Sequence, residues 1–211
     1  AAARDVKVRS AVMRDTDQDL TSVIVVPSDS PYARLADLDG QTVGVGAIDS
    51  PQATLIPLSH LRTSGAKVQV RRFDVGVGLH GDHIGGERDA ARALIAGDVS
   101  AACMIDGNHL LFNQEGTLPV GATRILGQTE RFDHCTMTIL DSAPAALADR
   151  FVELLLSMSY ADPRLRPLLD LEGLTQWRLG RVSGYGPLTA AVDETGFYDA
   201  AGQVTIEDYE P

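Results

Sequence analysis

The sequence lacks the features of membrane-spanning, disulfide-stabilised and nucleic-acid-binding proteins. Its 211 residues include only two cysteines, Cys103 and Cys135, which are too few for a disulfide framework. No apolar run approaches the roughly 18 residues needed to cross a bilayer. The net charge of −11 disfavours binding to nucleic acids and to anionic membrane surfaces, because like charges repel.

The sequence is compatible with more than one cellular compartment. The first ten residues are polar and mixed in charge, unlike a signal peptide. The chain is therefore expected either in the cytoplasm or, if a leader has been removed, in the periplasm or another extracytoplasmic space. Hydrophobic residues make up 44% of the chain, which is enough for one α/β core or two small lobes.

Short apolar runs alternate with helical patterns along most of the chain. Strands are predicted at 22–27, 41–45, 67–73, 100–105, 124–126 and 136–140. Helices are predicted at about 51–64, 87–96, 107–113, 145–159, 163–171 and 187–194. This order favours parallel α/β layers, in which ligands bind where strands end and helices begin. Those junctions lie at 48–54, 80–88 and 106–109.

Six segments stand in a fairly specific order between about residues 20 and 198. They are 21–27 (TSVIVVP), 35–46 (LADLDGQTVGVG), 47–57 (AIDSPQATLIP), 87–106 (ERDAARALIAGDVSAACMID), 123–127 (TRILG) and 177–198 (WRLGRVSGYGPLTAAVDETGFY). Together they resemble the periplasmic phosphate- and phosphonate-binding proteins of ABC importers.

The resemblance implies an α/β fold of the two-lobed, type II periplasmic-binding-protein class. Lobe 1 would comprise residues 1–37 and 131–211, and lobe 2 would be the inserted segment 38–130. The family has a further β-α-β-α segment before this point, so lobe 1 is expected to be incomplete. Its open sheet edges would then be covered by another chain, by a domain-swapped copy or by sequence outside these residues.

The resemblance also implies a ligand site at a helix start. In the family, a Ser/Thr-rich helix start holds phosphoryl oxygens, as the dipole and N–H groups of such a start favour. The matching stretch keeps Ser50, but Pro51 has no N–H and Gln52 stands in place of a second hydroxyl. Thr54 is a further candidate for ligand binding. An ordinary helix cap by Ser50 fits the same pattern.

Three other residues are candidate ligand contacts. Arg88 replaces a family histidine and suits a carboxylate or phosphate, although a solvated helix-face arginine is the alternative. Asp106 matches an acidic residue that, in the family, meets a cationic group of the ligand. Tyr32 lies near the first expected crossing between lobes and is predicted to line the cleft.

Histidines gather near the same junctions. His83 precedes the predicted helix at 87, His109 follows Asp106, and His134 lies beside Cys135 where the chain should cross back. His83, His109 and His134 are candidate ligands for Zn or Fe, and neutral hydrogen-bonding histidines are the alternative. Cys135 and His134 are not expected to form a nucleophile–base pair, because neighbours on a strand point to opposite faces.

Three functions remain open from the sequence. The first is a solute-binding module that clamps a small anionic or zwitterionic ligand between two lobes and needs no cofactor. The second is an enzyme on the same scaffold, such as a metal-assisted decarboxylase, lyase or hydrolase that uses cleft His, Asp and Cys residues. The third is an interaction subunit that needs a partner chain. The fold alone does not choose among them.

Overall fold

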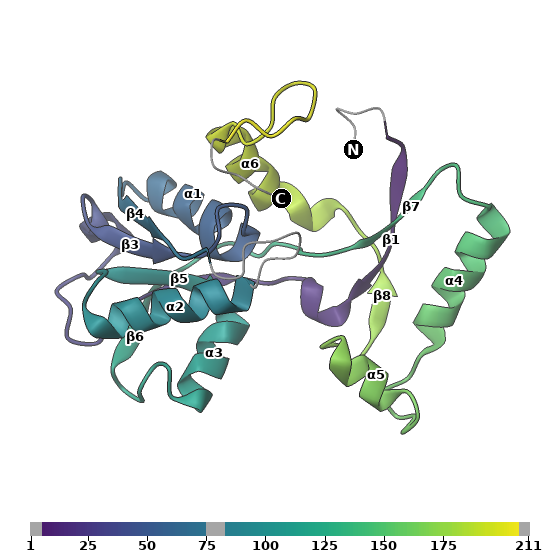
Figure 1. The fold of residues 1–211 in the computed structure, drawn as a ribbon, viewed down its shortest axis with the longest axis horizontal. Helices are drawn as coiled ribbons and strands as arrows, with labels where there is room; N and C mark the ends of the chain where they lie inside the picture. Colours follow the sequence, from purple (N-terminus) through teal and green to yellow (C-terminus); the bar gives the residue numbers. More distant parts are fainter. Residues whose placement is uncertain (1–5, 75–82, 207–211) are drawn as a thin grey trace. The chain divides into compact units, whose positions relative to one another are not determined.

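The computed structural model describes residues 6–74 and 83–206, without the side chain of His83. The chain forms two compact units (Figure 1). Unit 1 comprises Ala1–Leu20, Arg131–Gly186 and Tyr198–Gln203. Unit 2 comprises Thr21–Glu130, Pro187–Phe197 and Val204–Pro211. No helix in the described ranges is both long and apolar enough to span a bilayer.

Unit 2 is built on a five-stranded mixed sheet in the order β4-β3-β5-β2-β6. β3 (Thr42–Val45) is parallel to β4 (Gln69–Arg72) and to β5 (Ala101–Ile105). β2 (Ser22–Pro27) is antiparallel to β5 and to β6 (Thr123–Gln128). The prediction of parallel layers is therefore right for one half of the sheet and wrong for the other. Between β2 and β3 the chain forms only the 3-10 helix η3 (Leu35–Leu38) and no crossover α-helix.

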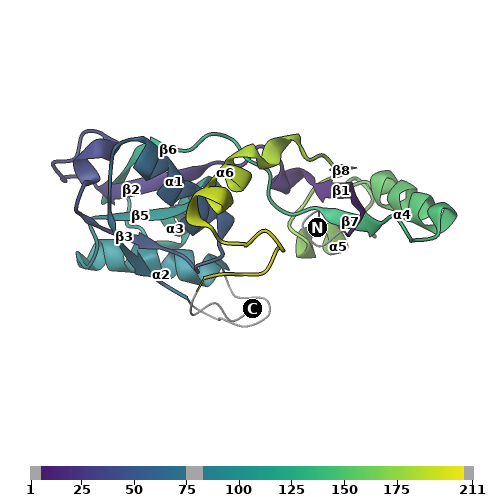
Figure 2. The ribbon, with the colours of Figure 1, turned by 90° about the horizontal axis from the view of Figure 1, so that it is seen from above.

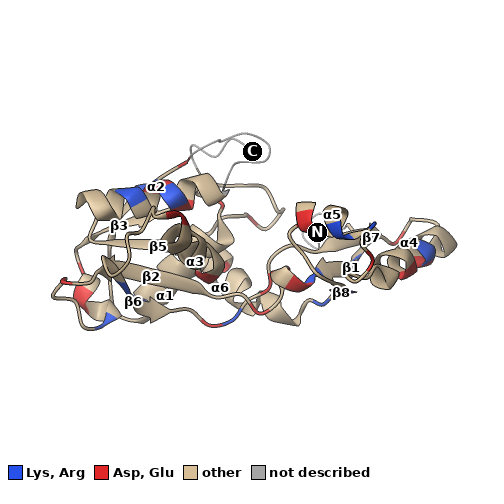
Figure 3. Ribbon diagram, turned by 90° about the horizontal axis from the view of Figure 1, so that it is seen from below, with Lys and Arg blue, Asp and Glu red and all other residues tan. Residues whose placement is uncertain are grey.

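Both faces of this sheet are covered by helices (Figure 2). The π-helical turn η4 (Pro51–Leu55) leads into α1 (Ile56–Thr63), which covers one face. α2 (His83–Ala96) and α3 (Asp106–Glu115) cover the other. Successive β2 residues alternate between two clusters: Val23 and Val25 pack towards α2, and Ile24 and Val26 pack towards α1. Burial on both faces explains why β2, β3 and β5 carry no charged residue (Figure 3).

Two smaller features complete unit 2. α6 (Gly186–Thr195) is tied to α1 by an ion pair of 2.5 Å between Arg62 Nε and Glu194 Oε1. Cys103, on β5, is fully buried, and burial raises the pKa of its thiol to about 12. It therefore behaves as a small core residue.

Unit 1 is built on a three-stranded antiparallel sheet in the order β7-β1-β8. The strands are β1 (Val8–Arg14), β7 (Met137–Leu140) and β8 (Trp177–Leu179). α4 (Ala145–Ser157) and α5 (Arg166–Leu171) contribute to a core with Val12, Leu155, Leu169, Leu174 and Trp177. β1 and β8 were missed by the sequence prediction, because β1 is interrupted by polar residues and β8 has only three residues.

Gly86 is placed in α2 where the helix passes close to the preceding chain. A Cβ at this position would lie 2.5 Å from the backbone oxygen of Phe73 and 3.6 Å from the Cα of Gly46. The first distance is too short for a real contact, so the close approach of α2 to the end of the parallel half of the sheet needs glycine. Gly107, in α3, has open space around it.

We predict that Gly86→Ala lowers the free energy of unfolding by about 1–3 kcal/mol, because the backbone must shift to admit the methyl group. Gly107→Ala is the matched control, and it should leave stability unchanged or raise it, since alanine favours a helix over glycine. Urea unfolding followed by circular dichroism measures both. An equal effect of the two substitutions would contradict the packing argument.

Candidate functional site

The starts of three helical segments meet at one edge of the unit 2 sheet. β3, β4 and β5 are parallel, so their carboxyl ends lie at the same edge. η4, α2 and α3 each begin after one of these strands. Such an edge, with several helix N-termini, is where open α/β sheets bind ligands and where anions are favoured.

Asp106 is held at this edge by a chain of hydrogen bonds. Its Oδ2 accepts a hydrogen bond of 2.8 Å from Thr21 Oγ1, and its Oδ1 accepts one of 2.7 Å from the Gly107 N–H. Gln128 Nε2 donates to Thr21 Oγ1 at 2.7 Å. The carboxylate is thus oriented while Asp106 itself stays exposed. Sequence reasoning missed Thr21 and Gln128, which reach this edge because β2 runs antiparallel to β5, and β6 runs antiparallel to β2.

Glu87 is a second buried acidic group near this edge that sequence reasoning treated only as part of a helix. It is completely buried, and its Oε2 accepts from the Ile105 N–H at 3.0 Å and from Asn108 Nδ2 at 2.8 Å. The carboxylate therefore joins the first turns of α2 and α3. The sequence signal that could have identified Glu87 is its position as an acidic residue near the start of a helix in an apolar, alanine-rich segment.

The hydroxyl groups of Ser50 and Thr54 form hydrogen bonds within or next to the η4 turn. Ser50 is buried, and its Oγ accepts from the Ala53 N–H at 3.2 Å. Thr54 Oγ1 donates to the Ala47 carbonyl oxygen at 2.7 Å. Gln52 is only 6% exposed, and its Oε1 has no hydrogen-bond partner among the described residues. A buried acceptor without a partner costs about 1–3 kcal/mol, so Gln52 is the group in this turn with unused hydrogen-bonding capacity.

Arg88 lies between α2 and α3. Its Nε donates to Glu115 Oε1 at 2.8 Å, and its guanidinium lies 5.1 Å from the ring centre of Phe112. These two contacts tie α2 to α3. A contact of Arg88 with the ligand stays a prediction.

Tyr32 lies at the opposite edge of the sheet from Ser50 and Asp106. Its hydroxyl donates to Gln41 Oε1 at 3.0 Å, and the same oxygen accepts from Ser100 Oγ at 3.1 Å. Gln41 and Ser100 directly precede β3 and β5. Because β2 runs antiparallel to these strands, the chain that follows β2 lies at the amino ends of β3 and β5. The structure thus does not bring Tyr32 to the edge that holds the other candidates.

A family profile described as the periplasmic substrate-binding protein of phosphonate ABC transporters matches residues 1–185. The chain belongs to this phosphonate-binding family. The resemblance to this family that the sequence indicated is confirmed, and so is the type II periplasmic-binding-protein fold. Among curated proteins, none matches the chain.

Solved structures share the fold at low sequence identity. PhnD1 from Prochlorococcus marinus, in complex with methylphosphonate, is 13% identical with a TM-score of 0.68, and the match covers 90% of this chain and 71% of that one. A protein from Xanthomonas citri bound to ATP is 17% identical with a TM-score of 0.66, covering 90% and 72%. The chain therefore matches about seven tenths of the length of these relatives.

The candidate histidines of this family member are divided between its units. His109 lies in α3 of unit 2, its Nε2 is 3.3 Å from Asn113 Nδ2, and burial lowers its pKa. His134 belongs to unit 1, and the side chain of His83 lies outside the described part of the chain. The predicted metal set of His83, His109 and His134 stays a prediction.

Next to His134, a buried carboxylate joins three segments of unit 1. Asp133 has a fully buried side chain, and each of its oxygens accepts a 2.7 Å hydrogen bond from Arg181. Oδ1 also accepts from the Asp19 N–H at 3.1 Å. Gly184 packs so closely that a Cβ there would lie 2.1 Å from the Asp133 carboxyl carbon. Hydrogen bonds from Arg181 lower the pKa of Asp133 although burial opposes this.

His134 and Cys135 contact each other, contrary to the sequence prediction. Cys135 Sγ lies 3.0 Å from His134 Nδ1, and Asp17 Oδ1 lies 3.6 Å from the same nitrogen. Strand alternation does not apply, because β7 begins only at Met137. Burial by itself lowers the pKa of His134, but hydrogen bonds to Asp17 and Cys135 outweigh it and raise that pKa to about 9.

We predict that Arg181→Met destabilises the protein by about 2–3 kcal/mol at pH 7, because it leaves a buried carboxylate without its cation. The folded pKa of Asp133 is depressed, so its contribution is present above the unfolded value of about 3.9 and is lost as pH falls through the folded value. The difference between parent and variant should therefore shrink below about pH 4.

Chemical denaturation of both proteins between pH 3 and 8 measures this difference. Arg178→Met is the matched control, because among the described residues the Arg178 guanidinium donates a 3.4 Å hydrogen bond to Gln18 at the exposed surface and forms no ion pair. A pH-independent effect of Arg181→Met, or an equal effect of Arg178→Met, would show that Asp133 does not depend on this pair.

Proposed function

We propose that this family member binds a small phosphonate-, phosphate- or carboxylate-type ligand at the edge of the unit 2 sheet where β3, β4 and β5 end. The observation that carries the proposal is the buried Oε1 of Gln52, which has no hydrogen-bond partner among the described residues, at the same sheet edge as a fixed, exposed Asp106. Both residues are linked to the start of β2: Ser22 Oγ donates to the Gln52 carbonyl oxygen at 2.5 Å, and the adjacent Thr21 holds Asp106.

The chemistry of this edge favours a ligand with both signs of charge. Helix N-termini attract an anionic group, whereas the Asp106 carboxylate attracts a cationic one. The Gln52 oxygen accepts a hydrogen bond and so suits an ammonium or hydroxyl group of the ligand rather than a bare phosphonate oxygen. We therefore propose a zwitterion, such as an aminoalkylphosphonate, as the preferred class.

We further propose that units 1 and 2 act as the two lobes that close on this ligand, as the family resemblance implies. The lobe boundaries expected from the sequence fall at residues 37 and 130, whereas the units part after Leu20 and after Glu130, and Pro187–Phe197 and Val204–Pro211 also belong to unit 2. Residues 21–37 contain β2, which pairs with β5 and β6 in the middle of the unit 2 sheet. We therefore propose that the two lobes have the boundaries of units 1 and 2.

We predict that 2-aminoethylphosphonate binds more tightly than methylphosphonate, and that Asp106→Asn removes this preference. An ion pair at a partly solvated site contributes about 1 kcal/mol, or roughly fivefold in affinity. Isothermal titration calorimetry of both ligands with parent and variant measures the effect. Methylphosphonate binding itself should be weakened little, because it has no cationic group.

Asp98→Asn is the control for this experiment. Asp98 precedes β5, so it lies at the opposite edge of the sheet, and it forms an exposed ion pair with Arg71 at 3.4 Å. The substitution makes the same change in net charge. If Asp98→Asn alters the preference as much as Asp106→Asn does, the site is not at this edge.

Unit 1 exposes an apolar stripe that we propose is covered by further polypeptide, either another chain or a swapped copy. Leu147, Phe151 and Leu154 lie on α4 at helical spacing and are 68%, 44% and 57% exposed. α4 packs on the core through Val152 and Leu155, so the stripe faces away from it. Leu168 and Leu171 of α5 are exposed as well. Apolar groups gathered in this way mark an interaction surface.

We predict that the isolated 211-residue chain self-associates as its concentration rises, because association buries the stripe. Leu147→Glu combined with Leu154→Glu should restore a monomer without loss of stability, since both side chains are exposed. Light scattering coupled to size-exclusion chromatography measures the mass. Val120→Glu, at a 93% exposed position of unit 2, is the control. A parent chain that stays monomeric at all concentrations would rule out a second copy as the covering polypeptide and leave a different chain.

A further inference from the structure

Three potential metal ligands of unit 1 converge on one point. A carboxylate oxygen of Asp17, Nδ1 of His134 and Sγ of Cys135 all lie within 4.8 Å of one another. The sulfur is 3.0 Å and the carboxylate oxygen 3.6 Å from the same ring nitrogen. A catalytic triad would use the two nitrogens of the imidazole for its two partners. Here both partners face a single nitrogen, so the three potential ligand atoms surround one point, where a shared cation could bind.

The backbone holds this cluster in place. The His134 N–H donates to the Asp17 carbonyl oxygen at 2.9 Å, and the His134 carbonyl oxygen accepts from the Tyr185 hydroxyl at 2.5 Å. The preceding residue is the buried Asp133. Two chain segments more than a hundred residues apart are therefore held together by backbone hydrogen bonds, which places the side chains of Asp17 and His134 close to each other.

The Asp17 carboxylate is fixed from its other side. Its side chain is 5% exposed, and Arg14 donates to it twice, from Nε at 2.6 Å and from a terminal nitrogen at 3.0 Å. Arg14 also donates to the Glu172 carbonyl oxygen at 2.9 Å. Metal-binding carboxylates are commonly oriented by such outer hydrogen bonds.

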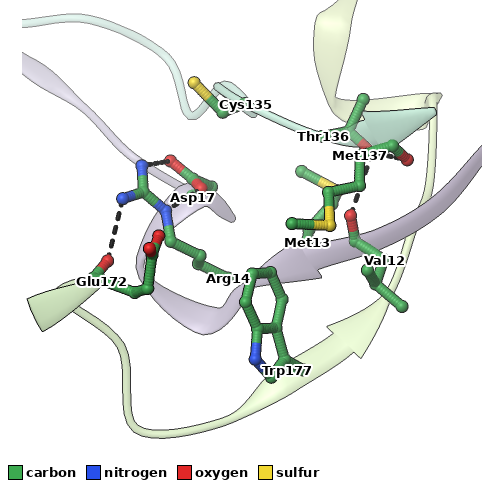
Figure 4. Close-up of a pocket in the computed structure, with 9 residues that line it drawn as sticks. All are labelled: Val12, Met13, Arg14, Asp17, Cys135, Thr136, Met137, Glu172 and Trp177. Carbon is green, nitrogen blue, oxygen red and sulfur yellow. Dashed lines mark hydrogen bonds and ion pairs between the residues drawn. The ribbon is translucent and has the colours of Figure 1, made fainter. Parts of the chain in front are cut away.

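A pocket of about 200 Å³ lies against the cluster. Asp17 and Cys135 contribute to its wall together with Arg14, while Met13, Met137 and Trp177 supply apolar surface (Figure 4). The pocket is large enough for several water molecules or a small ligand. A cation held by the three side chains would therefore have access to a further ligand from the pocket.

We propose that Asp17, His134 and Cys135 bind a Zn²⁺ ion, with the pocket supplying its open coordination position. Thiolate, imidazole and carboxylate are the three protein ligand types of Zn²⁺, and sites with three protein ligands keep one position open. The sulfur ligand disfavours Mg²⁺ and Ca²⁺. His134 is shared with the metal set predicted from the sequence, whereas Asp17 and Cys135 replace His83 and His109.

The charge balance of the cluster is compatible with this ion despite the nearby Arg14. Binding of Zn²⁺ releases one proton from the His134 imidazolium and one from the Cys135 thiol to solvent. The metal adds two positive charges and the two released protons remove two, so the summed charge of Asp17, Arg14, His134, Cys135 and the metal is unchanged. The Zn–N and Zn–S bonds replace an N–H and an S–H bond, with no change in oxidation state.

The test is a titration of the metal-free 211-residue protein with Co²⁺, which takes Zn²⁺ sites and reports thiolate coordination by absorption in the near ultraviolet. We expect saturation at one equivalent, displacement of Co²⁺ by Zn²⁺, and loss of the thiolate band in Cys135→Ser. Cys103→Ser, which alters the buried core cysteine, should keep the band. His134→Gln should weaken binding by more than the roughly 10- to 100-fold that loss of an outer-shell partner costs.

Either of two results would overturn the proposal. One is the absence of a thiolate–cobalt band in the folded parent protein, and the other is a band that persists in Cys135→Ser. Because Cys135 is exposed, its replacement by serine should not unfold the chain, and circular dichroism of each variant checks this. Ligand binding at the edge of unit 2 is measured separately and can fail without affecting this result.

Discussion

The buried Asp133 carboxylate is the interaction on which the arrangement of unit 1 depends. A fully buried charge is tolerated only when it is paired and hydrogen-bonded, and Asp133 meets this requirement through Arg181 and the Asp19 N–H. Three segments, at 17–19, 132–134 and 181–185, are thereby forced together. Asp19 is the only described non-glycine residue with a positive φ, 59°, and Gly184 leaves room that a side chain would fill. The positions of His134 and Cys135 follow from this constraint.

In unit 2 the deciding feature is the direction of one strand. β2 runs antiparallel to β5, so the residue before β2 meets the residue after β5, which places Thr21 against Asp106. The same direction sends Tyr32 to the far edge. Apolar runs and helix starts could be predicted from the sequence, because they depend on local spacing. Strand direction could not be predicted, because a run of β-branched residues has the same pattern in a parallel and in an antiparallel strand. The lack of a crossover helix before β3 is only a weak signal of the antiparallel arrangement.

The proposed metal ligands differ in the same way, because some follow from local sequence and others only from contacts between distant segments. The sequence indicated that His134 and Cys135 lie beside acidic residues near a crossing. It could not supply Asp17, because Leu20 and Phe132 must first pair as an antiparallel bridge, with hydrogen bonds of 2.8 Å in both directions. It also led to a wrong conclusion about Cys135 and His134, since alternation was applied to residues that precede the strand. The predicted set of His83, His109 and His134 stays a prediction, and the proposed cluster shares His134 with it.

The family likeness and the individual residues determine different properties of the chain. Structures with this fold and TM-scores above 0.6 are described with methylphosphonate and with ATP, at identities of 13% and 17%. A fold does not by itself select a ligand, so at the proposed site this would fall to the side chains of the sheet edge. In this chain the η4 hydroxyls are engaged within the turn, and a carboxamide oxygen and a carboxylate remain available. Acceptor groups at an edge of helix N-termini favour a ligand that carries hydrogen-bond donors as well as an anionic group.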